Sequence, residues 1–245
     1  MCTVTFIPLK NGIILTSNRD EHIERPVALY PEIYILNNKK LVFPKDTKAN
    51  GTWFISNEEG DVGIILNGAF QKHVHKTSYR KSRGLILPEL FQHENAFEEM
   101  IRYDFSGIEN FTMILWVNKQ LREIRWNGSE LYIHEHDPNR AYIWSSVTLY
   151  SPAMMDERSK WFKEWIKTGN TISQRSIIDF HTNTASTNHE YGLKIKRSNN
   201  ICTTSITSVY IAVEKTYHYH KDCIQNIESI LEYEQLSQHS RITDN

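Results

Sequence analysis

The chain opens with Met1-Cys-Thr-Val-Thr-Phe-Ile-Pro-Leu-Lys-Asn-Gly-Ile-Ile-Leu-Thr-Ser-Asn-Arg-Asp-Glu21, and this stretch decides the fold. Two apolar runs, 4–9 and 13–15, flank Asn11-Gly12. Asn-Gly between β-rich runs is typical of a two-residue type I′ turn, because both residues accept a positive φ. The stretch therefore predicts a β-hairpin at the start of the chain.

The predicted hairpin brings three kinds of functional group together. With residues 11 and 12 as the loop, Cys2 lies opposite Glu21 and Val4 lies opposite Arg19. Side-chain alternation puts these four residues on one face of the hairpin and Asp20 on the other. A thiol thus comes within reach of a guanidinium and a carboxylate, and Asp20 joins them only if the strand end bulges or twists.

The cysteine at position 2 has two readings. Cysteine is small enough for the initiator methionine to be removed, which leaves a thiol and a free α-amine on one residue. Such an amine titrates near ~8, so part of it is neutral and can take a proton from the thiol. A nearby arginine lowers the pKa of a thiol. The alternative is an ordinary small residue at the start of a strand, since free cysteine mostly behaves as a small hydrophobe.

Several short motifs, taken together, resemble one known family. The run after the N-terminal Met-Cys resembles the NRDE-motif family, also called the Transport and Golgi organisation protein 2 family. The resemblance covers most of residues 1–213, and the order and spacing of the motifs carry it. These motifs are Ser17-Asn18-Arg19-Asp20-Glu21, Asp46…Gly51-Thr52-Trp53, Leu66-Asn67, Ser82-Arg83-Gly84, and Trp144-Ser145-Ser146 before Ser151-Pro152.

The resemblance implies a fold and a chemistry. The family is similar to N-terminal-nucleophile hydrolases of the bile-salt-hydrolase and penicillin-acylase kind, which cleave non-peptide amide C–N bonds. It implies a four-layer αββα sandwich. Carried over residue by residue, it implies Cys2 as nucleophile, Arg19 and Asp20 as orienting groups, and Asn67 as a contributor to the oxyanion hole.

Two departures from the hydrolase pattern keep a second interpretation open. Ser146 stands where those enzymes have a second oxyanion asparagine; a hydroxyl can still donate a hydrogen bond but reaches less far. Their late arginine has no counterpart in the neutral segment 202–209. The alternative is a non-catalytic member that binds a lipid-like or haem-like small molecule, in keeping with the family's links to membrane traffic, lipid metabolism and haem movement.

Composition limits the partners and the compartment. The 245 residues fit one domain over 1–245, and a formal net charge of −1 offers no electrostatic case for a nucleic-acid partner. Three scattered cysteines make no disulfide framework, which fits a cytoplasmic protein. We expect no secretory signal and no transmembrane segment. The expected partner is a small-molecule substrate or ligand, and the sequence leaves the oligomeric state open.

The order of elements predicts the α+β class. Strands, one helix, more strands, two helices and further strands follow one another without βαβ alternation, which favours antiparallel sheets with helices outside. We expect a helix over 85–103, helices from 154 and over 173–181, and a C-terminal amphipathic helix over 222–238. The expected strands cover 33–36, 41–43, 52–56, 62–66, 111–117, 121–126, 131–134, 141–144, 201–213 and 217–220.

Histidine and glycine patterns predict neither a metal nor a cofactor. His73-Val-His75 and His134-Glu-His136 are close pairs, and a third lies in 218–223 beside Cys223. Structural zinc normally needs four ligands, and the second half of such a motif is missing. No glycine-rich phosphate loop and no Gly-x-Ser-x-Gly nucleophile elbow occurs. The prediction is therefore no metal site and no cofactor.

Overall fold

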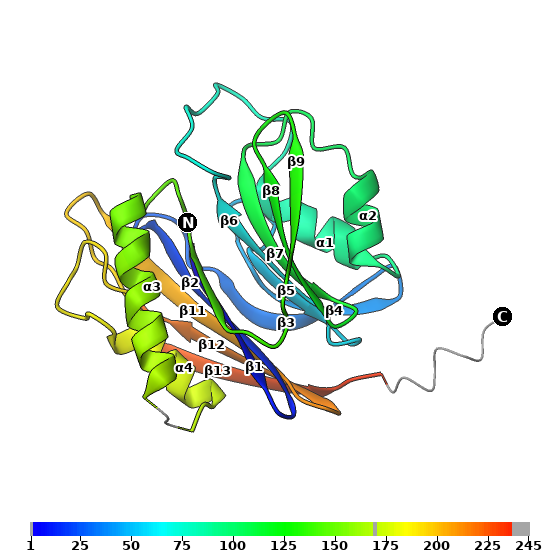
Figure 1. Cartoon of the computed structure of the whole chain (residues 1–245). Helices are drawn as coiled ribbons and strands as arrows, with labels where there is room; N and C mark the ends of the chain where they lie inside the picture. Colours follow the sequence, from blue (N-terminus) through cyan, green and yellow to red (C-terminus); the bar gives the residue numbers. More distant parts are fainter. Residues whose placement is uncertain (1, 169–170, 237–245) are drawn as a thin grey trace.

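The computed structural model describes residues 2–168 and 171–236. Two antiparallel sheets pack face to face, and helices cover the outer face of each, which gives four layers (Figure 1). Helices α3 (Pro152–Lys167) and α4 (Gln174–Asn183) lie outside one sheet, and α1 (Ile86–Phe91) and α2 (Ala96–Arg102) lie outside the other. The predicted α+β class and the αββα sandwich are confirmed.

The first sheet, sheet A, has six strands in the order β10-β1-β2-β11-β12-β13. The second, sheet B, has seven in sequence order, β3-β4-β5-β6-β7-β8-β9. The strands of sheet A are β1 (Cys2–Leu9), β2 (Gly12–His22), β10 (Tyr142–Ser145), β11 (Ile201–Ile211), β12 (Lys215–Asp222) and β13 (Ile227–Glu234). Those of sheet B are β3 (Leu29–Leu36), β4 (Lys39–Lys45), β5 (Phe54–Asn57), β6 (Val62–Asn67), β7 (Phe111–Val117), β8 (Gln120–Trp126) and β9 (Leu131–His136).

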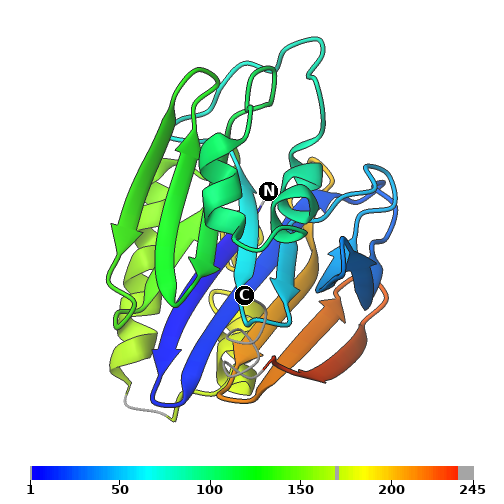
Figure 2. The same cartoon turned by 90° about the vertical axis from the view of Figure 1, so that its right-hand side faces the viewer.

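The helices begin where the sequence supplies caps. The Ser151 side chain accepts from the Met154 amide, with proline in the first turn of α3, and Ser173 forms a capping box with Ser176 at α4. A short 3₁₀ helix over Arg83–Leu85 leads into α1. Figure 2 views the sandwich from the side that α1 and α2 cover.

Alternation in β1 and β2 gives sheet A two different faces. Val4, Phe6 and Leu15 join the apolar core between the sheets, whereas Ile7 and Ile14 pack under α3 and α4. Buried polar groups also lie between sheet A and the helices. They include Thr3, Thr5, Asn18 and Asp20 of the sheet, Arg158 of α3 and His181 of α4.

The predicted register of the opening hairpin is wrong by two residues. Leu9 pairs with Gly12, so the loop consists of Lys10 and Asn11, and Cys2 faces Arg19 instead of Glu21. Gly12 has φ +148° and lies against β11, where an added Cβ would be 2.0 Å from the Ile211 carbonyl oxygen. Because β11 approaches so closely, Gly12 belongs to the strand, and the turn moves one residue toward the N-terminus. A shift of two keeps every side chain on its predicted face.

Two predicted helices also need correction. The helix expected over 85–103 is split, because the Asn95 side chain accepts from the amides of Phe97 and Glu98 and starts α2 afresh. The C-terminal helix expected over 222–238 is wrong where the structure describes it, since β13 pairs there with β12; residues 237 and 238 lie outside the described residues. Exposure alternates along β13, which is the period of an edge strand.

Among the described residues, no helix combines the length and the apolar character needed to cross a bilayer.

Candidate active site

Cys2 begins β1 at one end of the sandwich and lines a cleft of about 720 Å³. The side chain is 2% exposed, and its neighbour across the hairpin is Arg19. The end of β6 and the loop over 71–84 lie at the same end of the molecule (Figure 1). Arg19 and Asn67 line the same cleft. A cleft of this size suits a small-molecule ligand.

The guanidinium of Arg19 is held by groups other than the thiol. Its Nη2 donates to Asp46 Oδ2 at 2.5 Å, and its Nη1 donates to Thr204 Oγ1 at 3.2 Å. It also lies over the Trp53 ring, 4.6 Å from the centroid. Arg19 therefore presents a fixed positive charge beside Cys2.

Asp46 is the anion that holds this charge in place. It accepts hydrogen bonds from Arg25 as well as Arg19, and the Arg25 Nε–Oδ2 distance is 2.8 Å. Burial by itself raises the pKa of Asp46, but hydrogen bonds from Arg25 and the Ala49 amide and the charge of Arg19 outweigh it and lower the pKa. Glu21 stands at the edge of the cluster, 4.0 Å from Arg19 and 3.8 Å from Arg25.

Asp20 faces the opposite side of β2, toward the helices. Its Oδ2 accepts from the Tyr150 hydroxyl at 2.6 Å, and its Oδ1 accepts from the Thr203 hydroxyl at 2.6 Å. The guanidinium of Arg158 stacks on the Tyr150 ring at 3.5 Å. Burial raises the pKa of Asp20 against the lowering effect of the Arg158 charge.

A bulge lies beside Asp20, but it is in the neighbouring strand β11 and does not bring Asp20 to the Cys2 face of the hairpin. The pairing of β2 with β11 skips one residue, so that Asp20 faces Thr203 while Arg19 faces Ser205. The extra residue, Thr204, both accepts from the Arg19 side chain and donates to the Arg19 carbonyl at 3.1 Å. The bulge therefore lets Thr204 contact Arg19 while the adjacent Thr203 contacts Asp20.

Ser146 and Asn67 come together beside Cys2. The Ser146 amide donates to the Cys2 carbonyl at 3.0 Å, and the Ser146 hydroxyl donates to the Asn67 carbonyl at 2.7 Å. A further hydrogen bond of 3.0 Å joins the Ser146 and Thr148 hydroxyls. Ser146 thus ties the start of β1 to the end of β6.

The thiol itself departs from the sequence expectation. Burial raises the pKa of Cys2, and the Asp20 carboxylate adds to this rise, whereas Arg19 lowers the pKa. The balance is upward, because a fully buried thiolate loses its hydration. Burial therefore favours the protonated thiol of Cys2, which needs a base before it can attack.

The segments 51–53 and 82–84, which the sequence analysis quoted as family motifs without assigning them a role, form another wall of the cleft. The Thr52 amide donates to the Gly84 carbonyl at 2.8 Å, and an added Cβ at Gly51 would lie 2.4 Å from that carbonyl. Arg83, placed by the same turn, lines the cleft, and burial lowers its pKa. Sequence reasoning missed Asp46 as the partner of Arg19, although the aspartate stood in a quoted motif.

Comparison with known proteins identifies the family of the chain. Residues 1–231 match the family Transport and Golgi organisation 2. The chain belongs to this family. No curated protein matches it by sequence.

The fold of this family member is that of N-terminal-nucleophile hydrolases. An N-acylethanolamine-hydrolyzing acid amidase ortholog from Caenorhabditis elegans superposes with a TM-score of 0.59 at 9% identity, covering 84% of this chain and 92% of that one. A mutant conjugated bile acid hydrolase from Clostridium perfringens superposes with a TM-score of 0.53 at 10% identity, covering 94% and 92%. At these identities the likeness concerns the fold.

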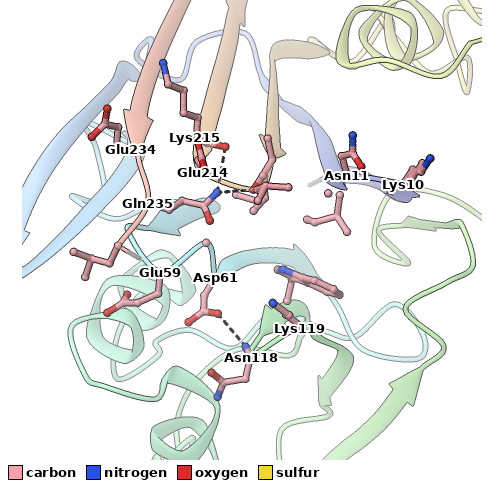
Figure 3. A pocket seen from close by; sticks show the side chains of 18 residues that line it. Lys10, Asn11, Glu59, Asp61, Asn118, Lys119, Glu214, Lys215, Glu234 and Gln235 are labelled. Atoms are coloured by element: carbon pink, nitrogen blue, oxygen red, sulfur yellow. Dashed lines mark hydrogen bonds between the residues drawn. The ribbon is translucent and has the colours of Figure 1, made fainter. Parts of the chain in front are cut away.

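Figure 3 shows a larger cavity, of about 1120 Å³, from close by. It is lined by the loop of the opening hairpin, at the end of β1 opposite to Cys2. Figure 3 shows Lys10 on the sheet A side of its opening and Lys119 on the sheet B side. Gln235 closes one flank by donating to the carbonyls of Ala212 and Lys215 at 3.0 and 3.1 Å. Of the described residues that line this cavity, none is a predicted site residue, so the candidate chemistry belongs to the smaller cleft.

Proposed function

We propose that this member of the Transport and Golgi organisation 2 family is a cysteine N-terminal-nucleophile hydrolase that cleaves a non-peptide amide C–N bond. The observation that carries the proposal is the place of Cys2, directly across from Arg19 at the floor of a cleft that Asn67 also lines. The fold shared with amidases is consistent with it.

The proposed mechanism begins once Met1 is removed. Because burial raises the pKa of the thiol, a base is needed, and the α-amine of Cys2 takes the thiol proton. Sγ then bonds to the amide carbonyl carbon of the substrate. The side-chain amide of Asn67 donates to the developing oxyanion. The C–N bond then breaks, the leaving amine carries away the proton held by the α-ammonium, and water hydrolyses the thioester to release the acid and restore the thiol.

The remaining residues position these groups. Arg19, fixed by Asp46, keeps a positive charge beside the thiolate as it forms. We assign Asp20, whose charge acts on Cys2 from the other face of β2, to orienting the α-amine. The Ser146 hydroxyl donates its proton to the backbone carbonyl of Asn67 and is not free to donate to the oxyanion. We therefore assign Ser146 to holding Asn67 in place.

The charge of the cleft favours an acidic substrate. Five arginine and lysine side chains line it against three carboxylates. Since Lys81 is paired with Glu89 outside the lining, the excess amounts to one positive charge. An excess of positive charge attracts anions. We therefore propose that the substrate is an amide of a small or lipid-like acid, with a carboxylate on either its acyl or its amine portion.

The test is intact mass followed by turnover of an N-acyl amino acid panel. We expect a mature chain that begins at Cys2, and a Cys2→Ser variant that loses turnover. Cys223→Ser is the matched control, because this cysteine lies in the turn between β12 and β13, outside the residues that line the cleft. Retention of Met1, or full turnover by the Cys2→Ser chain, contradicts the mechanism. Saturable binding of haem or acyl-chain ligands without turnover would instead favour the non-catalytic alternative.

A further inference from the structure

Two histidines and a glutamate converge at the rim of the Cys2 cleft. His73 Nε2 lies 3.0 Å from Glu109 Oε1, and His75 Nδ1 lies 2.6 Å from the same oxygen. One ligand atom from each of the three residues lies within 4.8 Å of the other two. The histidines come from the loop over 71–84, and Glu109 comes from the segment just before β7.

We propose that His73, His75 and Glu109 form a binding site for a divalent transition metal of the zinc class. Two imidazoles and one carboxylate are a donor set that zinc sites with an open fourth position use. With metal–ligand distances near ~2.1 Å, tetrahedral ligand atoms stand roughly 3.4 Å apart, so the two histidine–Glu109 distances of 3.0 and 2.6 Å need only a small outward shift. Oxygen-preferring cations such as Mg²⁺ do not favour this set.

The surroundings of Glu109 support a ligand role. Arg83 Nη2 contacts the other carboxylate oxygen, Oε2, at 2.8 Å and leaves Oε1 to the histidines. Metal-ligating carboxylates are commonly held by such outer hydrogen bonds, which fix their orientation. The side chains of His73 and Glu109 are each 12% exposed, so both are already ordered by packing. His75 is 70% exposed and can close onto the ion from the solvent side.

The site has a structural consequence for the cleft. Two of its ligands sit on the 71–84 loop and the third just before β7, an inner strand of sheet B, so a bound ion cross-links the loop to the start of that strand. All three residues line the same cleft as Cys2. Metal binding thus fixes one wall of the cleft, with the fourth coordination position free for water or an oxygen of the bound molecule. None of the three residues takes part in the proposed amide chemistry.

The test is titration of the full-length chain, stripped of metal by a chelator, with Zn²⁺ alone. We expect one ion per chain, a higher melting temperature with Zn²⁺ but not with Mg²⁺, and tetrahedral absorption bands when Co²⁺ replaces Zn²⁺. Since losing even an outer partner of a ligand costs about 10–100-fold in affinity, His75→Ala and Glu109→Gln should each weaken binding by at least about tenfold.

Two controls separate this site from other thiols and imidazoles. His134→Ala removes an exposed histidine from a different His-x-His pair, His134-Glu-His136, and should leave the zinc affinity unchanged. Cys2→Ser should also leave it unchanged, which distinguishes failure of this proposal from failure of the amidase proposal. Absence of a saturable site in the wild-type chain, or equal affinities for the wild type, His75→Ala and Glu109→Gln, would overturn the assignment.

Discussion

At the scale of single residues, the buried Asp20 carboxylate depends on the hydrogen-bond donors that surround it. Tyr150 and Thr203 each donate a hydrogen bond to one of its oxygens, and Arg158 stacks on the ring of Tyr150. Arg158 is itself fully buried and donates to the Gly192 carbonyl at 2.6 Å. A buried carboxylate is costly unless such partners meet it. These partners lie 130 and 183 residues away along the chain, which is why sequence reasoning could name Asp20 but not its setting.

Tyr150→Phe tests this support. The change removes one hydroxyl and leaves an oxygen of Asp20 without its donor, so we expect unfolding to become easier by about 1–3 kcal/mol. Urea denaturation measures the loss. Tyr132→Phe is the matched control, because that exposed hydroxyl also donates to a carboxylate, Glu130, and its removal should change stability by less than about 0.5 kcal/mol. Equal effects in the two variants would mean that the Asp20 contact stabilises nothing.

At the scale of elements, the cleft wall depends on two loops that touch through their backbones. The 46–53 segment carries the partner of Arg19, and the 82–84 turn carries Arg83. They meet where Gly51 lies against Gly84, with the Thr52 amide bonded across the contact at 2.8 Å. Glycine at position 51 is required because a side chain there meets backbone, which cannot swing away.

Gly51→Ala should therefore destabilise the protein by about 1–3 kcal/mol, the usual cost of forcing an extra carbon into packed structure. Gly84→Ala is a graded comparison, since its nearest contact for an added Cβ is 3.3 Å instead of 2.4 Å. Melting curves should rank wild type first, Gly84→Ala second and Gly51→Ala last. The opposite order of the two variants would show that the loops do not meet as described.

Elements that depend on local pattern were predictable, and those that depend on distant neighbours were not. The meander of β7, β8 and β9 and helices α3 and α4 follow from periodicity and caps. The register of the hairpin depends on the close contact of Gly12 with Ile211. Residues 227–234 form a strand because they pair with β12. The candidate site shows the same division. The proximity of Cys2 and Arg19 follows from a local hairpin and was predictable, whereas Asp46 and Glu109 reach the cleft through tertiary contacts that the sequence does not reveal.

At the scale of the whole molecule, three buried histidines hold hydrogen bonds inside the sandwich, two of them between layers and one within sheet A. His181 of α4 shares hydrogen bonds of 2.7 and 2.8 Å with Asn18 and Thr5 of sheet A. His218 reaches from sheet A to Ser56 of sheet B at 2.8 Å, and His220 bonds Thr207 at 2.9 Å. Burial lowers the pKa of His181 and His218 to about 3 and that of His220 to about 4.

These histidines predict a loss of stability in mild acid. Each binds a proton near pH ~6.5 in the unfolded chain but stays neutral in the folded chain down to the lowered pKa, so the unfolded state gains protons as the pH falls. Stability should thus be level above pH ~6.5 and fall below it, by up to roughly 1.4 kcal/mol per histidine for each pH unit. Asp20, whose pKa burial raises, contributes a slope of opposite sign, but it is one group against three.

Urea denaturation at pH values between about 7.5 and 4.5 measures this slope, and a histidine variant assigns it. His181→Gln keeps a polar side chain between Asn18 and Thr5 but cannot be protonated, so it should flatten the slope by about one third, whatever it does to stability at neutral pH. His189→Gln, at an exposed position, should leave the slope as it is. If wild-type stability stays constant from neutral pH to pH ~5, the folded protein accepts these protons, and the three buried histidines are not held in their neutral form.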